Sequence, residues 1–75
     1  MREANYMKVY RIQDDFIKLG QLLKAADIAQ TGGEAKELIL DGQVIVNGEI
    51  ETRRGKKIYP GDVVACLGRE LTVEQ

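Results

Sequence analysis

Four basic side chains lie within five positions of this 75-residue chain, at Arg53, Arg54, Lys56 and Lys57 around Gly55. The whole chain carries 11 basic and 12 acidic residues, for a net charge of −1, so this positive charge is local. Arginine guanidinium groups bind phosphate oxygens bidentately, and a glycine lets the backbone approach a ligand closely. These residue types at this spacing predict a loop that binds the phosphates of a nucleic acid.

Three lysines and two glycines are predicted to extend this loop into a positively charged groove. Lys18 and Lys24 belong to a predicted first helix, and Lys36 projects from the first turns of a predicted second helix. Gly32 and Gly33 leave the first amides of the second helix uncovered, so that a phosphate oxygen can approach them. The same pair fits a plain interhelix turn equally well.

Recognition of bases has weaker support than recognition of phosphates. Tyr10 and Tyr59 suit stacking on an unpaired base, and they suit half-buried packing against a sheet at least as well. We therefore expect binding through backbone contacts and shape.

Catalysis and metal binding have little support in the composition. The chain has no histidine and one cysteine, which excludes the ordinary zinc ligand sets and Cys/His or Ser/His nucleophilic pairs. The carboxylates are interpreted as solvated faces and helix caps, so we expect no enzyme, no metal and no cofactor. Cys66, among apolar neighbours, is expected to be a small buried side chain. Without a membrane-length apolar run or a secretory signal pattern, a cytoplasmic location is expected.

The second helix has clear start and stop signals. Thr31 and Glu34 predict a capping box, in which the threonine accepts from the Glu34 amide and the Glu34 side chain reaches back to the Thr31 amide. Apolar residues then follow at helical spacing, and a glycine ends the helix. These residues are Ala35, Leu38, Ile39 and Gly42.

Short strands are predicted after this helix. The first spans 43–46 with Val44 and Val46 facing the core, and Asn47-Gly48 turns it into a returning arm over 49–52. A turn at 60–62 then leads to a strand over 63–67, and a turn at 68–70 leads to a last strand over 71–73.

Two elements are predicted before the second helix. Met7, Val9 and Ile12 alternate with Lys8, Tyr10 and Arg11, which predicts a short strand. A helical period then predicts a first helix over 18–26. Residues 1–6 are expected to be loose, with 7–75 as a single RNA-binding domain, and Met7 is as good a start as Met1. The fold class is α+β: two short packed helices followed by a small twisted antiparallel sheet, with a short N-terminal strand.

The order of these segments resembles the RNA-binding domain of ribosomal small-subunit protein four, also called the αL motif. The resemblance covers about two-thirds of the chain and rests on Lys18-Leu-Gly-Gln-Leu-Leu23, Thr31-Gly-Gly-Glu-Ala-Lys-Glu-Leu-Ile39, Gly42-Gln-Val-Ile-Val-Asn-Gly48 and Pro60-Gly-Asp-Val-Val64. The chain is most similar to the small stand-alone YbcJ/YaaA-like bacterial members. The resemblance implies that structured RNA, often ribosomal, binds across the second helix and the basic loop.

Carried over by position, Lys18 and Lys36 stand where the family pattern has basic residues. Two positions depart from the pattern: Thr31-Gly32 replaces a Ser-Arg pair, and Gly20 replaces an aspartate. Binding by the second helix is therefore expected to be weaker, with the basic loop compensating.

The sequence thus predicts a non-catalytic, monomeric protein that binds structured RNA, foremost ribosomal RNA, with ribosomal particles as further partners and no membrane. The alternative is a protein–protein interaction module whose basic loop binds an acidic partner, and a third hypothesis is a recognition arm of a larger RNA-modifying enzyme. The predicted RNA-binding residues are Lys18, Lys24, Gly32, Gly33, Lys36, Arg53, Arg54, Gly55, Lys56 and Lys57.

Overall fold

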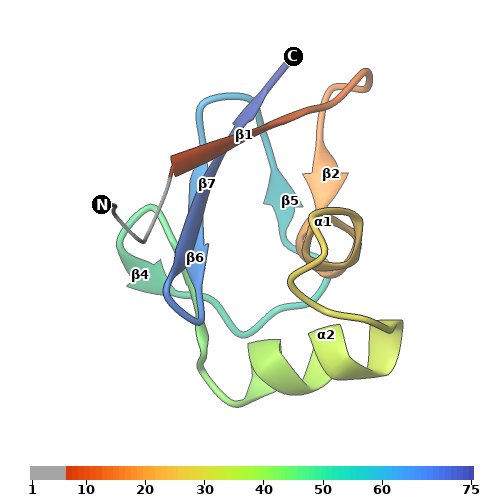
Figure 1. The fold of residues 1–75 in the computed structure, drawn as a ribbon, viewed down its shortest axis with the longest axis vertical. Coiled ribbons are helices and arrows are strands. Elements are labelled where there is room, and N and C mark those ends of the chain that lie inside the picture. Colours follow the sequence, from red (N-terminus) through yellow and green to blue (C-terminus); the bar gives the residue numbers. More distant parts are fainter. Residues whose placement is uncertain (1–6) are drawn as a thin grey trace, which may run out of the picture.

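The structure is a computed structural model that describes residues 7–75, so the predicted loose segment 1–6 lies outside the described residues. Two helices lie on one side of a twisted sheet (Figure 1). The elements in chain order are β1 (Met7–Arg11), β2 (Ile17–Lys18), α1 (Leu19–Ala25), α2 (Gly32–Leu40), β3 (Val44–Val46), β4 (Glu49–Ile50), β5 (Lys57–Ile58), β6 (Val63–Cys66) and β7 (Arg69–Glu74).

The predicted α+β class is confirmed, and the sheet is mixed. Its strand order is β1-β7-β6-β3-β4, with β1 parallel to β7 and the other neighbours antiparallel. A separate two-stranded sheet pairs β2 with β5, and its register sets Ile17 opposite Ile58 and Lys18 opposite Lys57. Because Lys57 lies in this strand, the basic loop ends one residue earlier than predicted.

The start of α2 agrees with the predicted capping box in one of its two bonds. The Glu34 amide donates to Thr31 Oγ1 at 3.1 Å. The Glu34 carboxylate, however, accepts from the Gln30 amide at 2.6 Å and not from the Thr31 amide. The first bond satisfies an amide of the first turn that the helix itself leaves unpaired. The second bond ties the residue before the N-cap to this turn.

The end of α2 and the hairpin after it follow the predicted turn chemistry. Gly42 has a φ of 77°, and the Gln43 and Gly42 amides donate to the Leu38 and Ile39 carbonyls in a Schellman motif. In the hairpin turn, Asn47 and Gly48 have φ values of 52° and 87°, the sign that a type I′ turn requires at both central positions.

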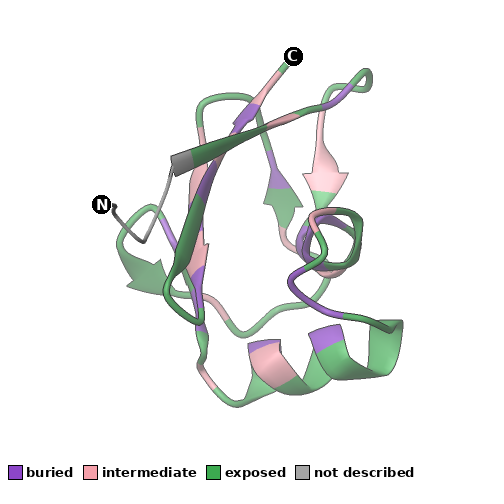
Figure 2. Ribbon diagram, in the orientation of Figure 1, coloured by how far each residue is buried: buried purple, intermediate pink, exposed green. Residues whose placement is uncertain are grey.

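The core lies between the helices and the inner face of the sheet (Figure 2). Leu19, Leu22 and Leu23 of α1 are fully buried there, together with the predicted inward residues Val44 and Val46 of β3. Cys66 is 2% exposed, as predicted, and this burial raises the pKa of its thiol. No helix between residues 7 and 75 has the length and apolar character needed to cross a membrane.

The pairing of β1 with β7 decides which face of β1 points to the core. The parallel register sets Lys8 opposite Leu71 and Tyr10 opposite Val73, and both β7 residues point into the core. Register partners share a face of the sheet, so Lys8 and Tyr10 face the helices while Val9 is 51% exposed on the other side.

A correction concerns the β6–β7 hairpin. Its turn is formed by Leu67 and Gly68, with φ values of 53° and 78°, and not by residues 68–70. Strand β7 therefore begins at Arg69, which pairs with Cys66.

Candidate nucleic-acid interface

The basic loop is fixed to the start of α1 by backbone hydrogen bonds. Lys18 occupies the N-cap position without a side-chain capping bond. Instead, the Leu19 amide donates to the Lys56 carbonyl at 2.8 Å, and the Gly20 amide donates to the Arg54 carbonyl at 3.0 Å. Amides in the first turn of a helix have no partner within the helix, so the loop supplies the missing acceptors. Two segments more than thirty residues apart are thereby held together.

Gly20 allows the Arg54 side chain to lie directly against α1. A Cβ atom at this position would stand 2.8 Å from Arg54 Cγ, closer than carbon atoms approach one another. Gly20 is therefore a contact point for the basic loop.

These contacts form a groove between α1, the start of α2 and the basic loop, which we call the basic groove. It has a volume of about 310 Å³ and is lined by Lys18, Gly20, Gln21, Lys24, Gly32, Arg54 and Gly55. The structure thus brings five of the predicted residues together, and none of the described residues that line the groove carries a carboxylate. Sequence reasoning missed Gln21, although the helical spacing of 18, 21 and 24 indicates that it lies between the two lysines.

The three cations of the basic groove are accessible. Lys18, Lys24 and Arg54 are all exposed. Between residues 7 and 75, no ion pair or hydrogen bond occupies their side-chain nitrogens. Their positive charge is therefore available to a ligand.

Arg53, by contrast, is already paired within the protein. Its Nε and backbone amide both lie 2.9 Å from Glu51 Oε2, and a second guanidinium nitrogen lies 3.2 Å from Oε1. These hydrogen bonds lower the pKa of the Glu51 carboxyl to about 2, so the pair stays ionised at neutral pH. Its neighbour Arg54 enters the basic groove, and the two arginines therefore have different surroundings.

The remaining predicted residues lie around this groove or away from it. Arg53, Lys56 and Lys57 line a hollow of about 460 Å³ with Gly55 and Tyr59, on the other side of the loop. The Lys57 ammonium lies 4.9 Å from the Phe16 ring centroid, within cation–π range. Gly33 and Lys36 line neither hollow.

Comparison with known proteins agrees with this arrangement of elements. The model of the S4 domain family matches residues 10–74. The chain belongs to the S4 domain family. Two curated relatives align with it over 57 residues, which is 76% of this chain. RlbA of Bacillus subtilis (strain 168), whose name describes a probable ribosome maturation protein, is 49% identical to this chain, and the alignment covers 80% of its length. YbcJ of Escherichia coli (strain K12), whose name describes a candidate RNA-binding protein, is 39% identical to this chain, and the alignment covers 81% of its length.

A solved structure has the same fold. The solution structure of E. coli YbcJ, described as having an αL motif involved in RNA binding, superposes with a TM-score of 0.74 at 30% identity. The alignment covers all of this chain and 96% of that one. The resemblance predicted from the sequence is thereby confirmed.

Proposed function

We propose that this S4 domain is a non-catalytic, cytoplasmic RNA-binding protein that holds structured RNA, foremost ribosomal RNA, in the basic groove. The observation that carries this proposal is a set of three exposed cations, Lys18, Lys24 and Arg54, around one groove on a protein of net charge −1. No carboxylate from residues 7–75 lines this groove. Phosphates that replace small counterions at such a site release them into solution, which favours binding. The names of RlbA and YbcJ support a role with RNA and ribosomal particles.

The pairing of β2 with β5 adds a second electrostatic argument. Lys18 and Lys57 are directly opposite each other in this antiparallel pair, and both are exposed. Like charges in this position repel each other and destabilise the sheet. A phosphate bound near them would relieve the repulsion, which favours an anionic ligand at this end of α1.

The first test compares two adjacent arginines. Arg54→Ala is expected to weaken binding of a structured RNA hairpin about tenfold, because one phosphate contact is lost. Arg53→Ala removes the same charge, but this guanidinium is already paired with Glu51. The affinity for RNA is therefore expected to fall by less than about threefold. Fluorescence anisotropy with a ribosomal RNA hairpin measures both. Equal losses of RNA affinity in the two variants would overturn the proposal that the basic groove binds RNA. Association with an acidic protein that survives ribonuclease treatment, without retained RNA, would also overturn it.

A glycine substitution tests the position of Arg54 without removing a charge. Gly20→Ala is expected to change the free energy of unfolding by no more than about 1 kcal/mol, since the better helix propensity of alanine offsets the close contact with Arg54. RNA affinity is expected to fall severalfold because the added methyl group displaces the Arg54 stem. Gly33→Ala is the matched control, at the same position in the first turn of α2, where the nearest atom is Thr31 Oγ1 at 3.9 Å. Equal affinities of the two variants would contradict the role of Gly20.

A further inference from the structure

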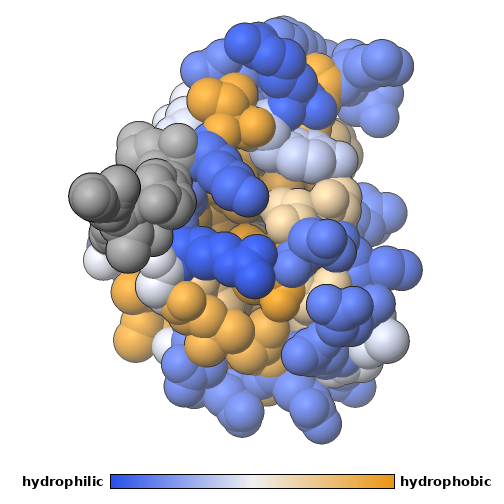
Figure 3. Space-filling view, viewed as in Figure 1, coloured by the Kyte–Doolittle hydropathy of each residue, from blue (hydrophilic) through white to orange (hydrophobic). Residues whose placement is uncertain are grey.

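A second groove lies on another side of α1, between its C-terminal end and the β1–β7 pair. It has a volume of about 460 Å³, and we call it the β1–α1 groove. Its lining includes the apolar side chains of Ala26, Ile28 and Leu71 together with the ring of Tyr10. In the space-filling view, hydrophilic side chains lie over hydrophobic ones at the centre of this face (Figure 3).

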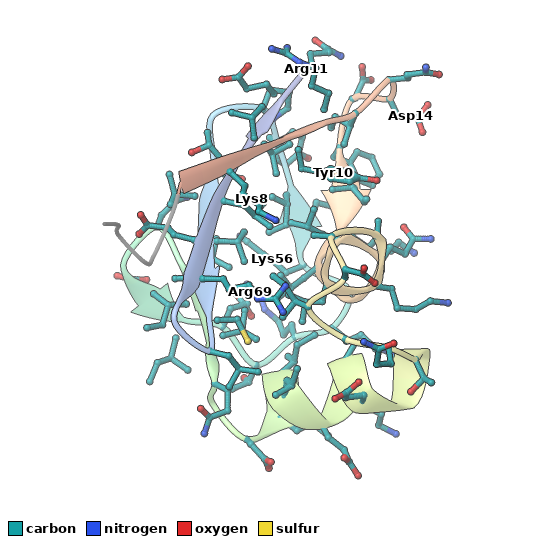
Figure 4. All side chains as sticks on the ribbon, viewed as in Figure 1. Lys8, Tyr10, Arg11, Asp14, Lys56 and Arg69 are labelled. Atoms are coloured by element: carbon teal, nitrogen blue, oxygen red, sulfur yellow. The ribbon has the colours of Figure 1, made fainter. Side chains whose placement is uncertain are left out.

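Two cations project into this groove from the core-facing side of the sheet. Lys8 lies opposite Leu71 in the β1–β7 register, and Arg69 precedes Leu71 by two residues, so the three share a face. Figure 4 shows Lys8 and Arg69 reaching from their strands toward α1. Cations on the inner side of a sheet are costly unless they stay solvated or find partners. The groove keeps both exposed here.

The guanidinium group of Arg69 is fixed at the groove by the protein itself. One of its terminal nitrogens donates to the Asp27 carbonyl at 3.2 Å, across 42 residues of sequence. Asp27 adopts a left-handed backbone with a φ of 64°, which few non-glycine residues do. A guanidinium has five N–H donors, and this bond uses one of them.

A third hollow lies between the β1–α1 groove and the basic groove on the exposed side of α1. It shares Gln21 with the basic groove, and it shares Tyr10 and Ala25 with the β1–α1 groove. A chain that leaves the basic groove at Gln21 therefore reaches Tyr10 along the surface of one helix.

We propose that the β1–α1 groove binds an unpaired nucleotide of the RNA that the basic groove holds, a proposal that rests on the function proposed above. The apolar floor and the ring of Tyr10 suit the face of a base, while Lys8 and Arg69 suit its phosphate. Asp27 and Glu70 also line the groove and make it less positive than the basic groove. A single nucleotide that offers apolar surface fits this balance better than the backbone of a duplex. Duplex and single strand thus occupy different sides of α1.

The test compares a blunt RNA hairpin with the same hairpin carrying a three-nucleotide single-stranded extension. The extension is expected to tighten binding to the unchanged protein about five- to tenfold. Lys8→Ala and Arg69→Ala are each expected to lose most of that gain and to bind the blunt hairpin within about twofold of the unchanged protein. Arg53→Ala is the matched control, since Arg53 lines neither groove nor the third hollow and pairs with Glu51 at 2.9 Å. Equal weakening of both RNAs by Lys8→Ala would overturn the proposal.

A trinucleotide titration followed by amide chemical shifts gives an independent measurement. Shifts are expected at Tyr10, Ala25, Asp27 and Arg69 rather than at Gly32 and Gly55, and Tyr10→Leu is expected to reduce them without unfolding the protein. Shifts confined to Gly32 and Gly55 would refute an unpaired-nucleotide site in this groove. If the unchanged protein does not bind the blunt hairpin, the proposed function of the basic groove fails. The trinucleotide result still decides the β1–α1 groove.

Discussion

The triple variant Lys18→Ala/Lys24→Ala/Arg54→Ala is expected to lose at least about 100-fold in affinity for structured RNA at roughly 0.1 M salt. Each side chain is exposed and lines the basic groove, so each substitution removes a phosphate contact and leaves the core untouched. The salt dependence is the sharper measurement. The slope of log K against log salt is expected to fall by about two to three units, since each neutralised phosphate contributes roughly 0.7 to 0.9.

A control variant with the same net charge separates groove contacts from general attraction. Arg11→Ala/Lys36→Ala/Arg53→Ala removes three cations that do not line the basic groove. The affinity of this variant for RNA is expected to fall by less than about tenfold, and most of the slope of log K against log salt is expected to remain. Both variants are expected to melt within a few degrees of the unchanged protein, because substitutions of exposed residues have small effects on stability. Equal losses of affinity in the two triple variants would show that RNA binding does not depend on the basic groove.

The largest effect on stability is expected from Ile58→Ala. Ile58 is fully buried in β5, opposite Ile17 of β2, and its strand follows the loop whose carbonyls cap α1. Removing its buried side chain is expected to cost about 2–5 kcal/mol. A domain of this size has a net stability of only about 3–5 kcal/mol, so the variant is expected to be largely unfolded at 37 °C. Urea unfolding followed by circular dichroism measures the change.

The chain offers a matched control for this prediction. Ile50 in β4 is 64% exposed, and Ile50→Ala is expected to change the free energy of unfolding by no more than about 0.5 kcal/mol. If Ile58→Ala is as stable as Ile50→Ala, then the pairing of β2 with β5 does not contribute to the fold. If Ile58→Ala folds but binds RNA weakly, the pairing positions the basic loop without stabilising the core.

Features that depend on a few neighbouring residues were predicted well from the sequence. Thr31 Oγ1 accepts a hydrogen bond from the Glu34 amide, Gly42 ends α2 in a left-handed conformation, and Asn47-Gly48 forms the expected turn. Each of these depends on backbone geometry within about five residues, where side-chain type decides the conformation. The helical spacing of α1 was equally sufficient, because three leucines at that spacing must share a buried face.

The inward face of β1 was not predictable in this way. Val9 is apolar and Lys8 is charged, yet Lys8 faces the helices and Val9 faces outward. The parallel register with β7, which lies some sixty residues away, fixes this face, and a shift of one residue would reverse it. Two cations consequently reach the β1–α1 groove, and nothing local to Lys8 or Arg69 indicates that they lie together.

The run from Arg53 to Lys57 shows the same division for the proposed binding site. The sequence by itself indicated that positive charge is concentrated there on an acidic chain, and it predicted that Lys18 and Lys24 of the first helix extend this charge into a groove. Only the tertiary structure decided which of these charges is available. Glu51 holds Arg53, the Phe16 ring faces Lys57, and Gly20 admits Arg54 to the basic groove. The physical reason is that unpaired amides at the start of α1 take their acceptors from the Arg54 and Lys56 carbonyls, which fixes the loop against α1 through contacts that are distant in sequence.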